Sequence, residues 1–244
     1  MDIQVGELIK FPGYVLGSTP DQVYQWFDDF NEFAVGSDGV LGGWINTTTE
    51  AGTTGSSVEG IVCDGSAGGH GVLKLLTDVA ADDYTQIQGP EVVKLEAGLP
   101  TVFKCRVLLQ NTGLAEWLVG LAITESDPMA AGAYFLTDSV CFTRDTGQGV
   151  DTVLLRATKD STAAGDLETD TATFAAVDAT WMNLAFYYDG DSKIIGYKDG
   201  TQIGEITTNI PDNEYLAPIA CINNSTAATG YMYIDYIGVW QQRA

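Results

Sequence analysis

From Ser56 to the C-terminus, apolar residues recur with a period of two in short runs, and clusters of Gly, Asp, Asn and Thr separate the runs. A period of two is typical of strands that bury one face. No long helical segment alternates with these runs, which argues against parallel βαβ architectures and favours two packed antiparallel sheets. We expect strands near residues 56–63, 71–77, 84–88, 91–96, 101–110, 115–124, 139–144, 150–158, 171–175, 181–188, 193–198, 201–208, 216–223 and 230–241.

Two turns are marked by Asp-Gly pairs. Lys198 to Thr201 contains Asp199 and Gly200, a pair that favours a two-residue type I′ hairpin turn. Asp189-Gly190-Asp191 repeats the pattern upstream. A short helix is expected at Asp127 to Ala131, where Pro128 suits a first helical turn.

The N-terminal part predicts one amphipathic helix. Residues 18–21 (Ser-Thr-Pro-Asp) combine capping residues, a first-turn Pro and an acidic residue at the positive end of the helix dipole. Val23, Trp26, Phe27 and Phe30 follow at helical spacing. The helix either closes one end of a sheet or presents Trp26 and Phe30 to a partner.

A single domain is expected over residues 1–244, because no linker and no repeat of fixed period divides the chain. Within it, residues 1–35 form an N-terminal segment with the helix, and residues 36–244 form an all-β sandwich. Met1 to Gly17 is either an edge strand or an assembly arm. The candidate partner-binding residues of this segment are Phe11, Tyr14, Trp26 and Phe30.

Charge excludes two classes of partner. The chain carries 11 Lys plus Arg against 33 Asp plus Glu, a formal net charge of −22. Nucleic-acid phosphates and anionic lipids would repel such a chain. The first residues lack the pattern of a signal peptide, and no apolar stretch is long enough to cross a membrane. The cysteines (Cys63, Cys105, Cys141 and Cys221) lie far apart in apolar segments and are expected to be buried thiols.

Few residues support catalysis. A glycoside hydrolase on a sandwich needs two carboxylates on one face, and no strand supplies them as an E-x-D-x-x-E pattern. The nearest acidic groups, Glu125 with Asp127 and the set Asp166, Glu168 and Asp170, lie in predicted turns. His70, the sole histidine, lies between two glycines in a Gly-rich run. We therefore expect a protein that is not an enzyme and that uses no cofactor.

Metal binding is also not expected. One histidine excludes multi-histidine sites. Calcium needs only clustered oxygens, which Asp78, Asp82 and Asp83, or Asp189 and Asp191, offer. Acidic turns are common in a chain of this charge, so we assign no metal site.

Exposed tryptophans would allow stacking on sugar rings. Trp117, Trp181 and Trp240 lie in apolar strands and are expected in the core. Trp44 follows Gly42 and Gly43 and is the best candidate for an exposed, glycan-binding residue.

The C-terminal third carries a resemblance to a known fold. Residues 181–190 read WMNLAFYYDG, residues 195–203 read IGYKDGTQI, and residues 231–240 read YMYIDYIGVW. A Trp-initiated strand, a hairpin with two x-D-G turns and a closing alternating strand resemble the concanavalin A-like, laminin G-like jelly roll over residues 100–241. The resemblance implies a two-sheet antiparallel jelly-roll sandwich.

The whole layout is similar to jelly-roll structural proteins of tailed-bacteriophage virions. This resemblance implies a homo-oligomeric capsid decoration protein that binds the major capsid protein or another virion protein. It also implies assembly in the bacterial cytoplasm and a place on the virion surface. A glycan-binding, lectin-like adhesion module and a tail or fibre surface component remain as alternatives.

Overall fold

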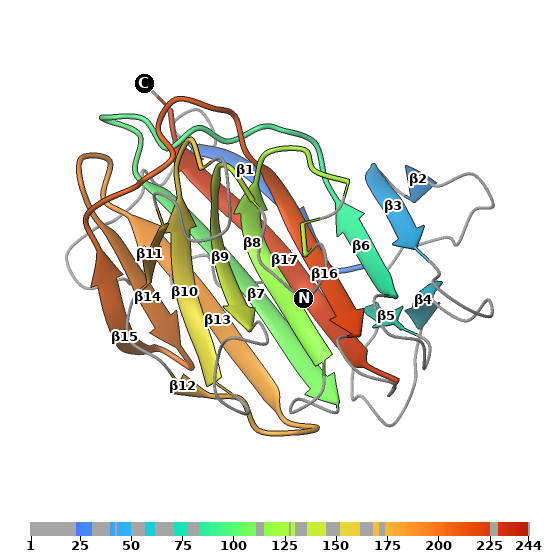
Figure 1. Ribbon diagram of the computed structural model, residues 1–244. Helices are drawn as coiled ribbons and strands as arrows, with labels where there is room; N and C mark the ends of the chain where they lie inside the picture. Colours follow the sequence, from blue (N-terminus) through green and yellow to red (C-terminus); the bar gives the residue numbers. More distant parts are fainter. Residues whose placement is uncertain are drawn as a thin grey trace.

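Two antiparallel sheets make up the computed structural model (Figure 1). The structure describes residues 23–30, 40–41, 43–49, 57–61, 71–77, 83–110, 115–126, 128–129, 136–144, 152–161, 168–170, 174–224 and 229–243. Within these ranges one sheet has eight strands and the other nine, and none of the described residues is helical. No described segment could therefore cross a membrane as a helix.

The eight-stranded sheet, here sheet I, has the order β15-β14-β13-β7-β17-β5-β4, and β1 also pairs with β17. Its strands are β1 (Val23–Asp28), β4 (Ser57–Ile61), β5 (Val72–Leu76), β7 (Thr101–Gln110), β13 (Trp181–Tyr188), β14 (Ile194–Lys198), β15 (Thr201–Ile206) and β17 (Tyr231–Gln242).

The nine-stranded sheet, here sheet II, has the order β11-β10-β9-β8-β16-β6-β3-β2, and β12 also pairs with β10. Its strands are β2 (Val40–Leu41), β3 (Trp44–Thr49), β6 (Tyr84–Gln88), β8 (Ala115–Ala122), β9 (Ser139–Arg144), β10 (Thr152–Thr158), β11 (Glu168–Asp170), β12 (Phe174–Ala175) and β16 (Ala217–Asn224).

The core lies between the two sheets and joins them. Phe103 and Phe186 of sheet I stack with ring centroids 5.0 Å apart, and Phe142 of sheet II lies 6.4 Å from Phe186. Gly120 of β8 allows β9 to approach closely, because a Cβ there would lie 2.2 Å from the Val140 carbonyl oxygen. The expected all-β sandwich of antiparallel sheets is confirmed.

The Asp-Gly hairpin is also confirmed. Lys198 pairs with Thr201, and the two residues between them, Asp199 and Gly200, have φ of 48° and 78°. Positive φ at both central positions is the type I′ geometry. The expected strand at 91–96 is reduced to a single bridge between Val93 and Leu216.

The prediction of an N-terminal helix is wrong for the residues that the structure describes. Val23–Asp28 forms strand β1 and pairs antiparallel with β17 from Val23↔Gln242 to Asp28↔Ile237. Tyr24 and Trp26 pack against the core, whereas Val23 and Phe27 pack on the outer face of sheet I. A strand that is apolar on both faces produces apolar spacings that also fit a helix, which explains the error. Residues 18–21 lie outside the described residues.

The second expected helix, Asp127 to Ala131, is described only at Pro128 and Met129, which form a turn. Its remaining residues lie outside the described ranges.

Candidate functional site

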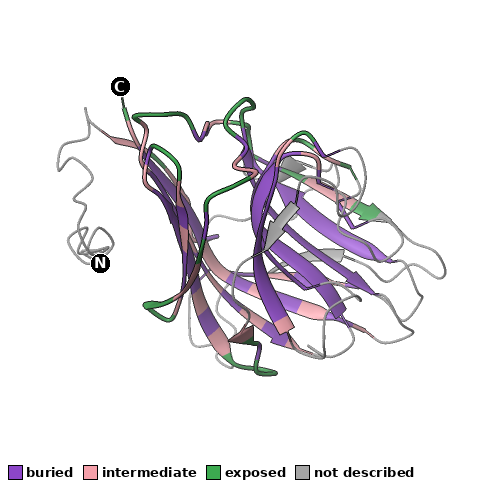
Figure 2. Ribbon diagram, turned by 60° about the vertical axis from the view of Figure 1, so that its left-hand side comes forward, coloured by how far each residue is buried: buried purple, intermediate pink, exposed green. Residues whose placement is uncertain are grey.

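The outer faces of the two sheets differ in burial (Figure 2). Every residue of β8, β9 and β16 in sheet II is buried, so these strands are covered on both sides. In sheet I, residues of β7 from Phe103 onward alternate between buried and half-buried. The outer face of sheet I is therefore the open face among these central strands.

The segment that follows β8 packs on the outer face of sheet II. We call this segment, residues 123–126 and 128–129, the crossing segment. Gln88 Nε2 donates to the Ile123 carbonyl at 2.7 Å, and Gln86 Nε2 donates to the Glu125 carbonyl at 2.7 Å. The Tyr84 hydroxyl donates to the Ser126 carbonyl. These bonds pair the polar side chains of β6 with the backbone of the crossing segment.

Apolar contacts also hold the crossing segment on sheet II. Met129, itself held by a 2.8 Å bond from Asn223 Nδ2 to its carbonyl, is buried in a cluster with Leu136 on the outer face of sheet II. The sheet residues of this cluster are Tyr84, Leu118, Ala122, Cys141, Ile219 and Cys221. The described side chains of β8, β9 and β16 on this face are therefore buried.

The same face offers one carboxylate. Among the described residues of β6, β8, β9, β10 and β16, Glu116 is the only Asp or Glu, and it is buried. A pair of carboxylates flanking a scissile bond is therefore not formed by these five strands.

The outer face of sheet I carries a row of large side chains across four strands. The register places Trp181 of β13 opposite Leu108 of β7, Leu108 opposite Tyr233 of β17, and Tyr233 opposite Lys74 of β5. All four are half-buried, and Tyr231 lies two residues before Tyr233 on the same strand. We call Leu108, Trp181, Tyr231 and Tyr233 the aromatic platform.

Polar groups lie among these rings. The Arg106 guanidinium lies 4.5 Å from the centre of the Trp181 ring and forms a 2.7 Å ion pair with Asp235. Asp235 lies at the bulge of β17, between Ile234 and Tyr236. Lys74 Nζ lies 5.1 Å from the Tyr231 ring centre. A cation over a ring is attracted by the electrons of that ring, so Arg106 and Lys74 each stabilise the ring that they contact.

Tyr236 extends this layer beside the platform. Its hydroxyl donates to Asn183 Oδ1 at 3.4 Å, and its ring stacks on Phe27 at 5.8 Å. Burial raises the pKa of Tyr236 well above the usual range of a phenol, and the nearby Cys105 and Asp235 raise it further. Tyr236 is therefore a neutral hydrogen-bonding group at any physiological pH.

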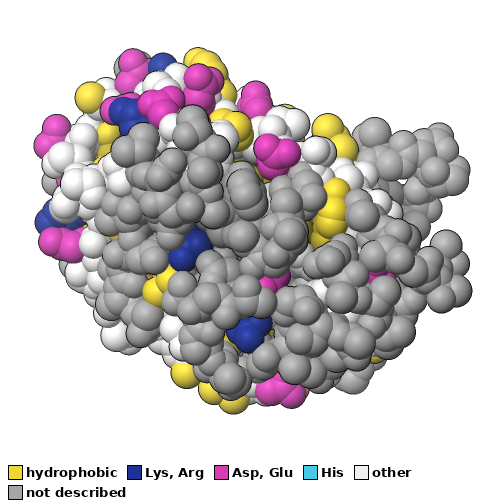
Figure 3. Space-filling model, viewed as in Figure 1, with side chains coloured by type: hydrophobic (Ala, Val, Ile, Leu, Met, Phe, Trp, Pro, Cys, Tyr) yellow, Lys and Arg dark blue, Asp and Glu magenta, His cyan; other side chains and the backbone are white. Residues whose placement is uncertain are grey.

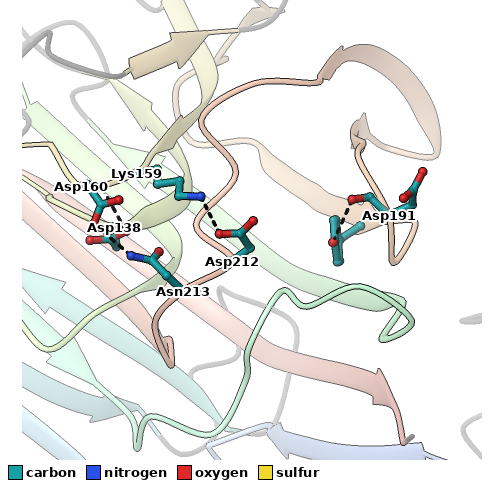
Figure 4. Close-up of polar contacts among 7 residues, drawn as sticks. Asp138, Lys159, Asp160, Asp191, Asp212 and Asn213 are labelled. Atoms are coloured by element: carbon teal, nitrogen blue, oxygen red, sulfur yellow. Dashed lines mark hydrogen bonds and ion pairs between the residues drawn. The ribbon is translucent and has the colours of Figure 1, made fainter.

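A second polar cluster lies in loops at one end of the sandwich (Figure 4). Lys159 Nζ binds Asp212 Oδ1 at 2.6 Å, Asn213 Nδ2 donates to Asp160 Oδ1 at 2.9 Å, and Asp160 N donates to Asp138 Oδ1 at 3.2 Å. Acidic side chains also gather with Lys and Arg at the upper left of the view in Figure 3.

The hydrogen bonds and the ion pair of this cluster join its own residues to one another, and they connect the loops from which these residues come. Burial raises the pKa of Asp138, with contributions from the charges of Asp160 and Glu214. No three Asp, Glu, His or Cys among the described residues are placed to hold a metal ion.

Trp44, the candidate glycan-binding residue, is buried, so the expected exposure is wrong. Its indole contacts both Trp26 and Phe30, with ring centroids 4.9 and 5.7 Å away. Phe30 is buried as well, and Trp26 is half-buried against the core. The expected role of Trp26 and Phe30 in binding a partner stays a prediction. Phe11 and Tyr14 lie outside the described residues.

Other candidates take structural positions. Asp189 Oδ1 accepts hydrogen bonds from the backbone N–H groups of Asp191, Ser192 and Lys193 at 2.9–3.0 Å, which closes a turn. Asp83 is buried. His70, Asp78, Asp82, Asp127 and Asp166 lie outside the described residues, and Glu168 and Asp170 belong to strand β11 rather than a turn.

The prediction of buried thiols is confirmed for the cysteines that the structure describes. Cys105, Cys141 and Cys221 are buried thiols, and burial raises the pKa of the Cys105 thiol. Cys63 lies outside the described residues.

The aromatic platform was not predicted from the sequence. Trp117 is in the core as expected, whereas Trp181 lies on the outer face of sheet I and Trp240 is buried against that face with Phe27. The alternation of Tyr231 and Tyr233 with Met232 and Ile234 was a signal for two aromatic residues on one outer face.

Comparisons with solved structures identify the same fold in other proteins. A protein of unknown function from Shewanella oneidensis MR-1 is 18% identical, with a TM-score of 0.58 over 91% of this chain and 90% of that chain. Peanut lectin is 11% identical, with a TM-score of 0.54 over 91% and 99%. The laminarinase from Rhodothermus marinus is 12% identical, with a TM-score of 0.57 over 90% and 97%.

No protein-family model matches the chain, and no curated protein matches it. The chain shares the jelly-roll sandwich fold of peanut lectin and of this laminarinase. At these identities the likeness establishes the fold alone. The capsid decoration role, the virion partner and the homo-oligomer gain no support from these comparisons and stay predictions.

Proposed function

We propose that the protein is a non-catalytic carbohydrate-binding module that binds glycans on the aromatic platform of sheet I. The observation that carries the proposal is the half-buried row of Trp181, Leu108 and Tyr233 across adjacent strands, with Arg106 and Asp235 beside it. The C–H face of a pyranose ring packs on aromatic rings, and its hydroxyls bond to charged and amide groups at the edge.

The fold supports the proposal indirectly. Two of the structures that share it are a lectin and a laminarinase, and both names refer to carbohydrate. Fold alone does not carry function, so the argument rests on the platform.

The non-catalytic part of the proposal rests on sheet II. Its central strands supply Glu116 as their one described carboxylate, and the crossing segment bonds to β6 and packs Met129 on the same face. Hydrolysis of a glycosidic bond requires two carboxylates and access to substrate.

The test is binding to a glycan array, followed by titration calorimetry of each hit with wild type and Trp181→Ala. We expect wild type to bind at least one glycan and Trp181→Ala to bind it at least about tenfold more weakly, a loss of about 1.4 kcal/mol.

Tyr215→Ala is the matched control, because Tyr215 is 58% exposed and lies outside the platform. It should bind as wild type does. A silent array for wild type, or equal affinities of wild type and Trp181→Ala with both proteins folded, would overturn the proposal.

A further inference from the structure

We infer that the ligand of the platform is an extended, uncharged polysaccharide that lies across the strands, and not a single terminal sugar. This inference rests on the proposed function and names its ligand class.

The shape of the face favours a chain over a single sugar. The platform consists of side chains that project from neighbouring strands of one sheet and are each half-buried, so it forms a surface and not a pocket. A surface contacts one side of each sugar ring, whereas a pocket encloses most of a small ligand. Useful affinity on a surface therefore requires several rings bound in line.

The register sets the direction of that line. Trp181, Leu108, Tyr233 and Lys74 lie opposite one another on β13, β7, β17 and β5. Neighbouring strands are about 4.8 Å apart, so the row spans roughly 14 Å and its two aromatic residues are roughly 10 Å apart. A chain of several sugar units laid perpendicular to the strands contacts both aromatic residues at once.

Charge favours an uncharged polymer. The Arg106 guanidinium, which lies over Trp181, is already paired with Asp235 at 2.7 Å. The chain as a whole has a net charge of −22, which repels a polyanion over the distance of the screening length. Neutral hydroxyls can instead bond to the Arg106–Asp235 pair and to Asn183 without separating the ions.

The test is a length series. Calorimetry compares neutral β-glucan oligosaccharides of two to six units, β-1,3-linked and β-1,4-linked, and soluble polygalacturonate serves as the charged polymer. We expect the hexasaccharide of at least one linkage to bind at least about tenfold more tightly than its disaccharide, and polygalacturonate not to bind.

Tyr233→Ala should reduce that gain, because it removes the second aromatic contact while leaving Trp181 in place. Tyr215→Ala is again the control. A hexasaccharide that binds no more tightly than its disaccharide, or polygalacturonate that binds more tightly than every neutral glucan, would overturn the inference while the proposed function stands. If both glucan series stay silent while the array gives another glycan, the same length series is run on that glycan. If wild type binds no glycan in either experiment, the proposed function itself fails.

Discussion

Asp28 Oδ2 accepts a hydrogen bond of 2.7 Å from Nε1 of Trp44, which joins β1 of sheet I to β3 of sheet II. Asp28 Oδ1 accepts a second bond of 2.7 Å from the backbone N–H of Phe30, which has a φ of 55°. One carboxylate therefore fixes both the end of β1 and a buried indole in the adjacent sheet.

Replacing that carboxylate should destabilise the fold. Asp28→Ala leaves the buried Trp44 N–H without its acceptor, and we expect the free energy of unfolding to fall by about 2–4 kcal/mol. Urea denaturation followed by tryptophan fluorescence measures the loss. Gln25→Ala, at an exposed position of the same strand, should change stability by less than about 0.5 kcal/mol. Equal losses in both variants would contradict the role of Asp28.

Among the described glycines, Gly120 has the closest contact for an added methyl group. Its Cβ would lie 2.2 Å from the Val140 carbonyl oxygen and 2.6 Å from Cys141 Cα, so β8 and β9 must separate. Gly120→Ala should cost about 3 kcal/mol or more, or prevent folding. Gly98→Ala is the control, because Gly98 has a φ of 85° and nothing within 4 Å, and it should cost about 1–2 kcal/mol of backbone strain. Thermal and urea unfolding of both variants tests the difference.

The crossing segment should depend on Met129. Its buried side chain contacts sheet II in a cluster with Leu118 and Cys141, so Met129→Ala leaves a cavity and should cost about 2–4 kcal/mol. Hydrogen exchange should then speed up at Ile123 to Ser126 more than in β7. Val177→Ala, at a residue 56% exposed, should change neither quantity. Unchanged exchange in Met129→Ala would mean that hydrogen bonds hold the segment without the Met129 side chain.

The buried thiols should react only through unfolding. In a Cys63→Ser variant, Cys105, Cys141 and Cys221 remain, and each is buried. Burial raises the pKa of Cys105, and the neighbouring Cys141 raises it further, so thiolate is scarce at neutral pH. We expect Ellman's reagent to modify these thiols at the rate of unfolding. Modification of any of them much faster than unfolding would contradict this.

The sandwich and most of its strands were predictable because turn residues and a period of two are local signals. Asp199 and Gly200 set the hairpin by their own backbone preferences, whatever the rest of the chain does. The strand order was not predictable, because the pairing of β17 with β7, β5 and β1 joins segments far apart in the sequence.

The platform could not be placed from the sequence because one pattern fits several arrangements. An apolar strand such as Trp181–Tyr188 does not reveal which of its faces meets the other sheet. Trp44 shows the converse: its glycine neighbours indicated exposure, and its burial arises from contacts with Trp26 and Phe30, which come from another strand and the turn after it.

Asp138 gives the fold a pH dependence with a definite sign. Burial raises its pKa in the folded state, and the charges of Asp160 and Glu214 add to this effect, while hydrogen bonds from Asp160 N and Thr137 partly oppose it. The folded protein therefore holds this proton to a higher pH than the unfolded chain, whose Asp pKa is about 3.9. The contribution of Asp138 to stability is greatest below about pH 3.9 and falls as pH rises through the raised pKa.

The variant Asp138→Asn removes this titration. It keeps a side-chain oxygen that can accept the hydrogen bond from Asp160 N, which is 3.2 Å long in the wild type. The melting temperature of the variant relative to wild type should therefore rise between about pH 3.5 and about pH 7. Melting curves of both proteins across this range measure the difference in melting temperature. A difference that stays constant with pH would show that burial does not raise the pKa of Asp138.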